Sequence, residues 1–294
     1  MTPIFRFVLP LATAAVMFAS SVHAQSRFVS LGHVDLSFYE VTASLVQQVL
    51  ERLGHNVAIH KGSHSEIYPM LGSGKIDLFV AAWLPNAHAE YWKEYEDQTE
   101  KVTALYEDAR LFWSVPDYVP ASAVSSVEDL RKPEVAEKMQ KIIRGTRADS
   151  GLMMGSKKIF DAYALAEAGY ALTPGKVADW VANFNDNIAA QRWFVMPLWQ
   201  PQYLNKVQKM RILAEPKKIF GGADTAWLVA RKELRGNLSK HAFGALQRMS
   251  LSVKAITELD YLVNVRNVPP REAARNWMAA HADTVSYWLE GESE

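Results

Sequence analysis

The sequence predicts an α/β protein built from two lobes, and three observations support this. Strand-like and helix-like segments alternate from Arg27 onward, as is typical of α/β folds. Two such alternating sets occur, separated by a break at residues 116–120, and a helical segment follows from Gly236. The chain has 294 residues, which is too many for one small core. We therefore expect two lobes, with the helical segment packed on one of them.

The first set of elements is expected between residues 28 and 83. In order it contains a strand at 28–34, a helix at 41–53, a strand at 57–59, a short helix at 64–72 and a buried strand at 76–82. Gly54 suits the position just after a helix end. Ser63 and Glu66 have the spacing of a capping box. Trp83 stands at the carboxyl end of the last strand.

Between residues 111 and 230 one strand precedes the break at 116–120, and the second set follows it. We expect a strand at 111–115, a helix opened by Ser125 and Glu128, a strand at 142–143, helices at 156–168 and 174–191, and strands at 193–199, 210–214 and 225–230. Beyond Gly236 the apolar spacing is helical to the end of the chain. We find no internal repeat and no low-complexity segment.

The composition excludes several classes of function. The 32 basic and 32 acidic residues balance, so the chain lacks the positive charge expected of a protein that binds nucleic acid or an anionic membrane. It has no cysteine, which excludes disulfides, thiolate metal sites and a cysteine nucleophile. Nine tryptophans are more than a generic core requires.

Residues 1–24 have the pattern of a secretory signal peptide. Arg6 provides a positive start, an apolar stretch follows, and Val22 and Ala24 place small residues before the expected cleavage point. The apolar run is shorter than the ~20 residues that span a bilayer. Without a cysteine at the cleavage point, a lipoprotein anchor is excluded. We therefore expect a soluble exported protein, periplasmic in a double-membraned bacterium.

The familiar catalytic and metal-binding motifs are absent from the sequence. The segment Gly72-Ser73-Gly74-Lys75 lacks the other residues of a phosphate-binding loop. His60 and His64 lie four residues apart, but no HExxH pattern or acidic-histidine cluster accompanies them, so we interpret them as surface or supporting histidines rather than zinc ligands. No G-x-S-x-G segment is present. We expect no enzyme activity, no cofactor and no metal.

Two tryptophans occupy positions that suit ligand binding. Trp83 and Trp199 each end an apolar strand and are soon followed by a proline, in Trp83-Leu84-Pro85 and Trp199-Gln200-Pro201. Ligands of open α/β sheets bind beyond the carboxyl ends of strands. Tryptophan faces attract cations, and quaternary ammonium groups are natural targets. The other tryptophans considered, Trp92, Trp180, Trp227, Trp277 and Trp288, are interpreted as packing residues.

The segment around Trp83 resembles a known family. Residues 77–88, Asp-Leu-Phe-Val-Ala-Ala-Trp-Leu-Pro-Asn-Ala-His, are similar to the signature of the glycine betaine/choline substrate-binding proteins of ABC importers, the OpuAC-like family. The similarity continues at residues 109–119, 126–130, 198–201 and 230–232, and extends over nearly all of residues 28–290. The resemblance implies a type II-like periplasmic-binding-protein fold with the ligand in the cleft between lobes. It assigns 28–112 and 214–294 to lobe 1 and 113–213 to lobe 2.

The family's binding residues transfer to matching positions of this chain. The resemblance implies that Trp83 and Trp199 are walls of an aromatic box and that His88 contacts the ligand carboxylate. It also implies that the backbone N–H groups of Gly151 and Leu152 hold that carboxylate, with Ser150 beside them in the pocket. A helix N-terminus suits such an anion.

The chain departs from the family pattern in the first lobe. Leu36 stands where the family usually has a tryptophan, which removes one wall of the box. Phe38, Trp113 or Tyr203 are the candidates to replace it. A missing wall weakens selectivity for trimethylammonium and could admit a bulkier betaine. Two smaller departures are Arg147-Ala148-Asp149-Ser150, where a proline-glycine turn is common, and Gln202 in place of a frequent histidine.

We therefore predict an exported, non-enzymatic binding component of an ABC importer, a monomer that delivers a small zwitterion to an inner-membrane permease. Glycine betaine is the primary candidate, and choline ranks lower because it lacks a carboxylate. Carnitine, proline betaine and an amino acid such as proline or histidine are alternatives within the same fold. A zinc-binding protein and an enzyme that reuses the fold are the alternatives from different classes.

Overall fold

The computed structural model describes residues 28–291, and the predicted signal segment 1–24 lies outside them. The strands are β1 (Phe28–Val34), β2 (Asn56–Gly62), β3 (Leu78–Leu84), β4 (Thr99–Pro116), β5 (Ile142–Arg144), β6 (Ala171–Thr173), β7 (Met196–Gln200), β8 (Met210–Ile212) and β9 (Asp224–Arg231). The α-helices are α1 (Ser37–Arg52), α2 (His64–Gly72), α3 (Ala89–Tyr95), α4 (Pro133–Lys138), α5 (Gly151–Ala162), α6 (Val177–Ala189), α7 (Leu204–Val207), α8 (Leu234–Asn237), α9 (Lys240–Arg248), α10 (Val253–Val265), α11 (Pro270–Ala280) and α12 (Ala282–Glu290). Short 3-10 helices are η1 (Glu96–Gln98), η2 (Val127–Arg131) and η3 (Leu165–Ala168).

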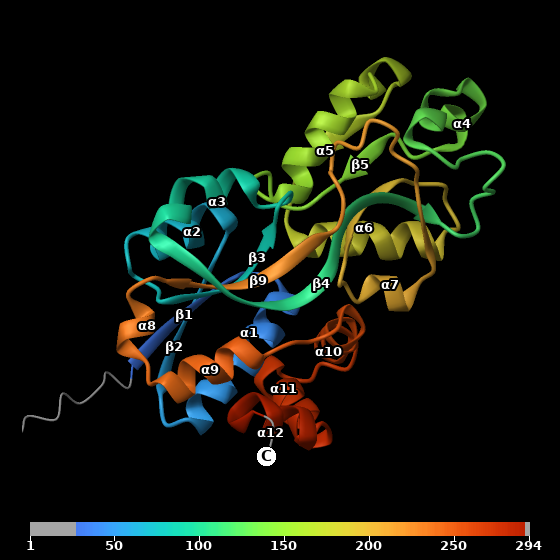
Figure 1. Ribbon diagram of the computed structural model, residues 1–294. Coiled ribbons are helices and arrows are strands. Elements are labelled where there is room, and N and C mark those ends of the chain that lie inside the picture. Colours follow the sequence, from blue (N-terminus) through green and yellow to red (C-terminus); the bar gives the residue numbers. More distant parts are fainter. Residues whose placement is uncertain (1–27, 292–294) are drawn as a thin grey trace, which may run out of the picture.

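A seven-stranded mixed sheet organises the molecule (Figure 1). Its strand order is β2-β1-β3-β9-β4-β7, and β8 also pairs with β4. Strand β1 is parallel to β2 and β3, whereas β9, β4, β7 and β8 join by antiparallel pairing. Strands β5 and β6 form a separate parallel pair. The predicted α/β fold class is confirmed.

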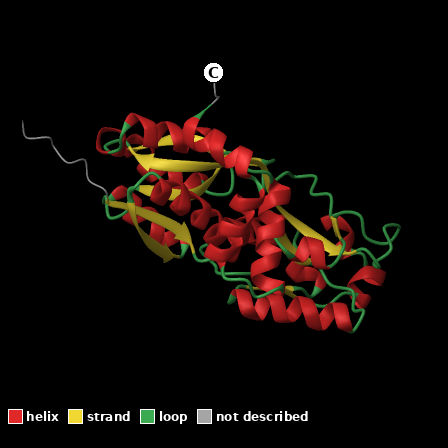
Figure 2. Ribbon diagram, turned by 90° about the horizontal axis from the view of Figure 1, so that it is seen from below, coloured by secondary structure: helices red, strands yellow, loops and turns green. Residues whose placement is uncertain are grey.

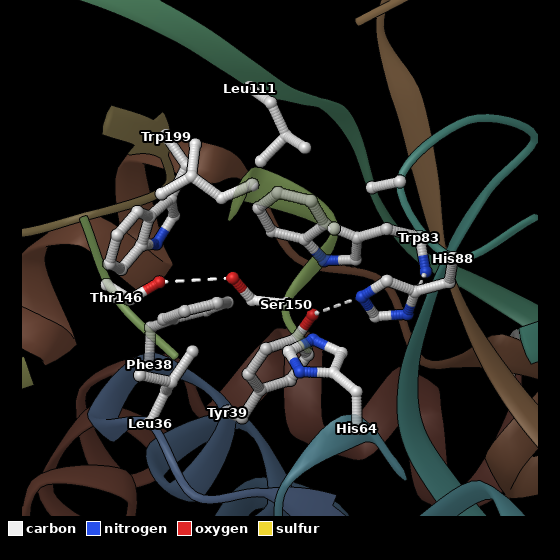
Figure 3. Close-up of a pocket in the computed structure, with 13 residues that line it drawn as sticks. Leu36, Phe38, Tyr39, His64, Trp83, His88, Leu111, Thr146, Ser150 and Trp199 are labelled. Carbon is white, nitrogen blue, oxygen red and sulfur yellow. Dashed lines mark hydrogen bonds between the residues drawn. The ribbon is translucent and has the colours of Figure 1, made fainter. Parts of the chain in front are cut away.

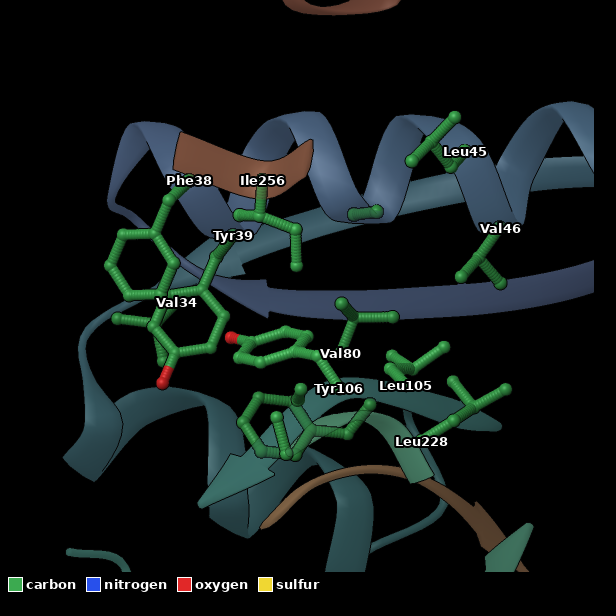
Figure 4. Packing of buried hydrophobic residues seen from close by; sticks show 14 of the residues in the cluster. Val34, Phe38, Tyr39, Leu45, Val46, Val80, Leu105, Tyr106, Leu228 and Ile256 are labelled. Carbon is green, nitrogen blue, oxygen red and sulfur yellow. The ribbon is translucent and has the colours of Figure 1, made fainter. Parts of the chain in front are cut away.

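Strands β1 and β3 are largely buried because helices cover this part of the sheet. Every residue of β3 is buried, which explains its continuous apolar sequence. Helix α1 lays Val46 against this sheet, while Leu45 on the other side of the helix and Ile256 of α10 belong to the same buried cluster (Figure 4). Figure 1 shows α9 to α12 gathered on the same side as α1, so the helical segment predicted after Gly236 packs back on the first set of elements.

Two hydrophobic clusters divide the buried residues. The larger surrounds β1, β3, β9 and α1, and the smaller contains Trp113, Val127, Ile143 and Ile159. Strand β4 connects the two regions: it pairs with β9 as far as Ala109 and with β7 from Arg110. Figure 2 shows the strands in two groups along an elongated molecule.

Several elements differ from the sequence prediction, and three of them show why. Strand β4 begins at Thr99 rather than 111, because charged residues at its exposed positions interrupt the apolar pattern. The helix predicted from 156 begins at Gly151, since glycines in its first turns lower the helical signal. The helix predicted from Ser125 and Glu128 is the 3-10 helix η2, and its capping box joins Ser126 to Asp129.

Candidate functional site

One pocket gathers most of the residues nominated from the sequence (Figure 3). It lies where the ends of β3 and β7 meet the first turns of α1 and α5. Its lining residues are Leu36, Phe38, Tyr39, His64, Trp83, Ala87, His88, Leu111, Thr146, Ser150, Gly151, Leu152 and Trp199. Trp83, His88, Trp199, Ser150, Gly151 and Leu152 are thus brought together, along with Leu36 and Phe38.

The loop between β3 and α3 holds Trp83 and His88 in a fixed relation. The backbone N–H of His88 donates to the Trp83 carbonyl at 2.9 Å, and the backbone N–H of Trp83 donates to His88 Nδ1 at 3.2 Å. Their rings are nearly parallel, at 15° and 6.3 Å between centroids. Asp224 of β9 fastens the outside of the loop by accepting from the backbone N–H groups of Asn86 and Ala87 at 2.6 and 3.0 Å.

The hydrogen bonds of His88 determine where its proton resides. Nδ1 accepts from Trp83 N–H and lies 2.9 Å from the Tyr68 hydroxyl, which donates to the same atom. Nε2 therefore carries the ring proton and is 3.4 Å from the Tyr39 hydroxyl. Burial, followed by the nearby His64, holds the pKa of His88 well below its usual value. His88 is thus a neutral ring that can donate one hydrogen bond from Nε2.

Aromatic faces enclose the opposite part of the pocket. Phe38 lies between the two predicted tryptophans, 5.7 Å from Trp83 and 6.0 Å from Trp199 between ring centroids. Trp199 stacks on Trp180 at 4.9 Å and 18°, so a second indole supports it from behind. The Nε1–H of Trp83 donates to the Tyr106 hydroxyl at 2.9 Å, which fixes the plane of that ring. Phe38 therefore occupies the space between the tryptophans, although Leu36 stands at the usual tryptophan position.

The N-terminus of α5 closes another side. Ser150 is its N-cap, and its hydroxyl oxygen accepts from Met153 N–H at 3.2 Å while donating to the Arg147 carbonyl at 2.8 Å. The N–H groups of Gly151 and Leu152 come before the first hydrogen bond of the helix, and Ser150 caps neither of them. These two amides are the donors that the positive end of the helix offers to the pocket.

A buried carboxylate supports the aromatic side of the site. Asp260 of α10 accepts from the Ser37 hydroxyl at 2.6 Å and from Tyr203 N–H at 2.8 Å. Ser37 begins α1 beside Phe38, and Tyr203 follows the strand that carries Trp199. Burial raises the pKa of Asp260 to about 6, against the hydrogen bonds it accepts. One side chain thus ties together the segments that carry two walls of the pocket.

Two nominated residues lie elsewhere. Trp113 packs in the smaller hydrophobic cluster and donates to the Ser156 hydroxyl at 2.9 Å. Tyr203 is buried near Asp260 and does not line the pocket. Trp113 lies on β4 beyond the point where that strand changes partner, and Tyr203 lies behind Trp199. These positions separate both residues from the pocket.

Sequence reasoning missed three polar lining residues, Tyr39, His64 and Thr146. Tyr39 follows β1 closely, so the rule that ligands bind beyond strand ends could have found it. His64 was interpreted as a surface or supporting histidine, but it is only 6% exposed. Its position at the start of the helix after β2 did not indicate that it would be buried. No signal in the sequence pointed to Thr146.

Two further features of the described chain bear on the class of protein. Between residues 28 and 291, no three histidine, cysteine or acidic side chains come close enough to hold a metal ion. Within the same residues, none of the helices has the length and apolar character needed to cross a membrane.

The sequence matches a family model, and the class of protein that the model describes fits this geometry. Residues 28–280 match the substrate binding domain of ABC-type glycine betaine transport systems. The chain belongs to this family. Its members are extracytoplasmic transport proteins that bind small ligands and work with an ABC permease, and they are not enzymes. The resemblance inferred from the segment around Trp83 is confirmed.

Relatives of known sequence agree with this assignment. The glycine betaine/carnitine transport binding protein GbuC of Listeria monocytogenes is 24% identical over 160 residues, 54% of this chain. The match spans 53% of GbuC, so the chain covers about half the length of this curated relative. An uncharacterised protein, ORF1 of Chromohalobacter salexigens, is 31% identical over 124 residues, 42% of this chain and 76% of that protein.

Solved structures share the fold of the whole family domain. The glycine betaine/L-proline-binding protein ProX of Borrelia burgdorferi has a TM-score of 0.81 at 24% identity, covering 89% of this chain and 96% of that one. Lactococcal OpuAC, in its closed conformation with glycine betaine, has a TM-score of 0.79 at 23% identity, covering 90% and 99%. At these identities the similarity shows the two-lobed binding-protein fold.

Proposed function

We propose that this chain binds glycine betaine, or a closely related quaternary-ammonium zwitterion, and delivers it to an ABC permease. One observation carries the proposal. The pocket has aromatic faces on one side and, on the other, a neutral histidine donor beside two free amides at a helix N-terminus.

The aromatic side suits a methylated ammonium group. Phe38, Trp83 and Trp199 present ring faces, and such contacts each contribute ~0.5–2 kcal/mol to binding a desolvated cation. A trimethylammonium group donates no conventional N–H hydrogen bond, so it needs no acceptor. Of the lining residues, all within 28–291, none is acidic. The ligand must therefore supply its own negative charge.

The opposite side suits that negative charge. Nε2–H of His88 and the N–H groups of Gly151 and Leu152 are donors, and the helix dipole adds a positive potential. A carboxylate one carbon from the quaternary nitrogen places both charges in one small molecule. Choline has one uncharged hydroxyl oxygen in place of the carboxylate and would leave some of these donors unpaired, so we expect it to bind more weakly than glycine betaine.

Titration calorimetry with a panel of ligands tests the proposal. We expect heat from glycine betaine and weaker or no binding of choline, proline and histidine. Carnitine and proline betaine complete the panel. Absence of binding by every methylated amine would reject the proposed function, and a zinc-dependent thermal shift would instead favour the metal-binding alternative.

A bulkier betaine is the second candidate, and Leu36 is the observation that favours it. A neighbouring hollow shares Leu36, His64, Thr146 and Ser150 with the pocket and continues towards Arg147. A larger substituent, such as that of carnitine or proline betaine, would extend past Leu36 into this space.

Placing tryptophan at this position tests which ligand the pocket suits. Leu36→Trp is expected to tighten glycine betaine binding about two- to thirtyfold through an added aromatic wall, and to weaken carnitine relative to glycine betaine by filling the hollow. Calorimetry with both ligands measures the ratio. Leu36→Ala, which adds no ring, is the control and should not tighten glycine betaine. Unchanged or weaker glycine betaine binding by Leu36→Trp would show that no wall is missing.

We also propose the lobe boundaries, the cleavage of the signal peptide and the location of this protein. Residues 28–112 and 214–294 form one lobe and 113–213 the other, as supported by the smaller hydrophobic cluster, whose buried members all fall within 113–213, and by the change of β4's partner at Arg110. The larger cluster also includes residues of 113–213, among them Trp180 and Trp199. The signal pattern at 1–24 supports cleavage and a soluble periplasmic protein, which we propose to be a monomer. Mass analysis of the exported protein would locate the cleavage point.

A further inference from the structure

His64 lies in the pocket beside His88, although nothing in the proposed site assigns it a role (Figure 3). Its ring is perpendicular to that of His88, at 83° and 4.8 Å between centroids, and stacks on Tyr91 at 24° and 6.0 Å. The side chain is 6% exposed. Within residues 28–291 its ring nitrogens make no hydrogen bond, so they are available to a ligand.

The two histidines differ in their capacity to take up a proton. Nδ1 of His88 already accepts from Trp83 N–H and from the Tyr68 hydroxyl. Protonating that atom would place it against the Trp83 N–H and break that hydrogen bond, and the Tyr68 hydroxyl would have to turn from donor to acceptor. His64 has no such constraint. If a negative charge enters the pocket, His64 is therefore the ring that gains a proton.

The acidic groups around His64 stay ionised in the physiological pH range. Asp149, in the loop before α5, accepts from the backbone N–H and hydroxyl of Ser65 at 3.2 and 2.8 Å and from Arg147 at 3.2 Å. Burial acts against these bonds, but together they lower the pKa of Asp149 to about 2. On the same helix as His64, hydrogen bonds from Ser63 lower the pKa of Glu66.

The remaining titratable neighbours are tyrosines. Tyr68 of α2 and Tyr91 of α3 face the histidine pair, and Tyr39 of α1 reaches His88 from the other side. Burial raises the pKa of all three above that of a free phenol. None of them changes charge between pH 4 and 8. Burial, opposed by Asp149 and reinforced by Arg147, lowers the pKa of His64 to about 4, so the ring is neutral in the free protein.

We propose that His64 is a further ligand-binding residue, which becomes an imidazolium when the ligand carboxylate enters and so couples binding to the uptake of one proton. This inference rests on the proposed function, because it requires a carboxylate ligand. The proton comes from the solvent and goes to a ring nitrogen of His64; no other bond changes. His88 and the α5 amides donate to the same carboxylate without titrating.

The sign of the pH dependence follows from linkage. A nearby carboxylate stabilises the charged ring, so the pKa of His64 rises on binding from about 4 towards its ordinary value of 6.5. Affinity then increases as pH falls through the bound-state pKa and levels off below the free-state pKa. If the ordinary value is fully recovered, glycine betaine binds about tenfold more tightly at pH 5.5 than at pH 7.5.

Calorimetry at pH 5.5, 6.5 and 7.5, in two buffers of different ionisation enthalpy, tests the proposal. The wild-type protein is expected to gain about tenfold in affinity and to take up nearly one proton at pH 5.5. His64→Asn keeps a polar side chain that cannot titrate, and should lose both effects. His60→Asn, on β2 and outside the pocket lining, is the matched control and should behave like wild type.

Choline separates a coupling role from a merely structural one. Because it has no carboxylate, its affinity should not rise at pH 5.5, and His64→Asn should not change its pH profile. A structural role predicts equal weakening at every pH and for both ligands. A pH-independent wild-type affinity for glycine betaine, or pH dependence retained in His64→Asn, overturns the inference. Absence of glycine betaine binding by the wild type at every pH rejects the proposed function instead.

Discussion

Gly151→Ala is expected to weaken glycine betaine binding by about five- to 150-fold, the effect of ~1–3 kcal/mol of overpacking. A methyl group at this position would lie 2.2 Å from the Ala87 carbonyl oxygen and 3.0 Å from its carbon. These are backbone atoms, and Asp224 holds their loop through Asn86 and Ala87. The added carbon would therefore force α5 away from the loop that carries His88, and the donors to the carboxylate would separate.

Alanine is the better helix former, so a loss of affinity would not reflect a weaker helix. Calorimetry gives the dissociation constant, and thermal unfolding checks that the protein remains folded. Gly222→Ala is the matched control, because no atom lies within 4 Å of the added carbon, and its affinity should equal that of wild type. Wild-type affinity in Gly151→Ala would show that the ligand-bound protein does not need this close approach.

Sequence patterns located the elements that form the first core but could not define their pairing. The apolar run before Trp83 identified a buried strand, and Ser63 with Glu66 identified the start of α2. Strand β4 was recognised only in part, because its first half exposes charged residues between buried ones. Its change of partner from β9 to β7 depends on contacts with residues about a hundred positions away, which local periodicity does not encode.

The part of the candidate site that could be predicted is the part formed by tryptophans at strand ends. Trp83 and Trp199 stand at such ends, and both line the pocket. Phe38 could be nominated but not chosen over Trp113 and Tyr203, because only the packing between α1 and the ends of β3 and β7 brings its ring between the tryptophans. His64 was missed because a single histidine at a helix start has the same sequence appearance whether it is exposed or buried.

Trp83→Ala and Trp199→Ala are each expected to weaken glycine betaine binding about five- to thirtyfold, corresponding to ~1–2 kcal/mol for one lost aromatic face. Because both rings contact Phe38, the two losses are not expected to be additive. Calorimetry on the single and double variants measures them. Trp277→Ala, in α11 and stacked on Trp288, removes an indole outside the pocket lining and should leave the affinity unchanged. Wild-type affinity in both pocket variants would refute the aromatic box.

The same walls could act through apolar burial alone, and a ligand that lacks the positive charge distinguishes the two mechanisms. In tert-butylacetate a carbon replaces the quaternary nitrogen of glycine betaine, so shape and carboxylate are kept while the positive charge is lost. If the faces of Trp83 and Trp199 attract the cation, Trp199→Leu should weaken glycine betaine much more than tert-butylacetate, and Trp199→Phe should lie between wild type and Trp199→Leu. Equal losses for both ligands would mean that the walls exclude water without stabilising the charge. The selectivity of the pocket would then depend on its donors to the carboxylate, His88 and the first amides of α5.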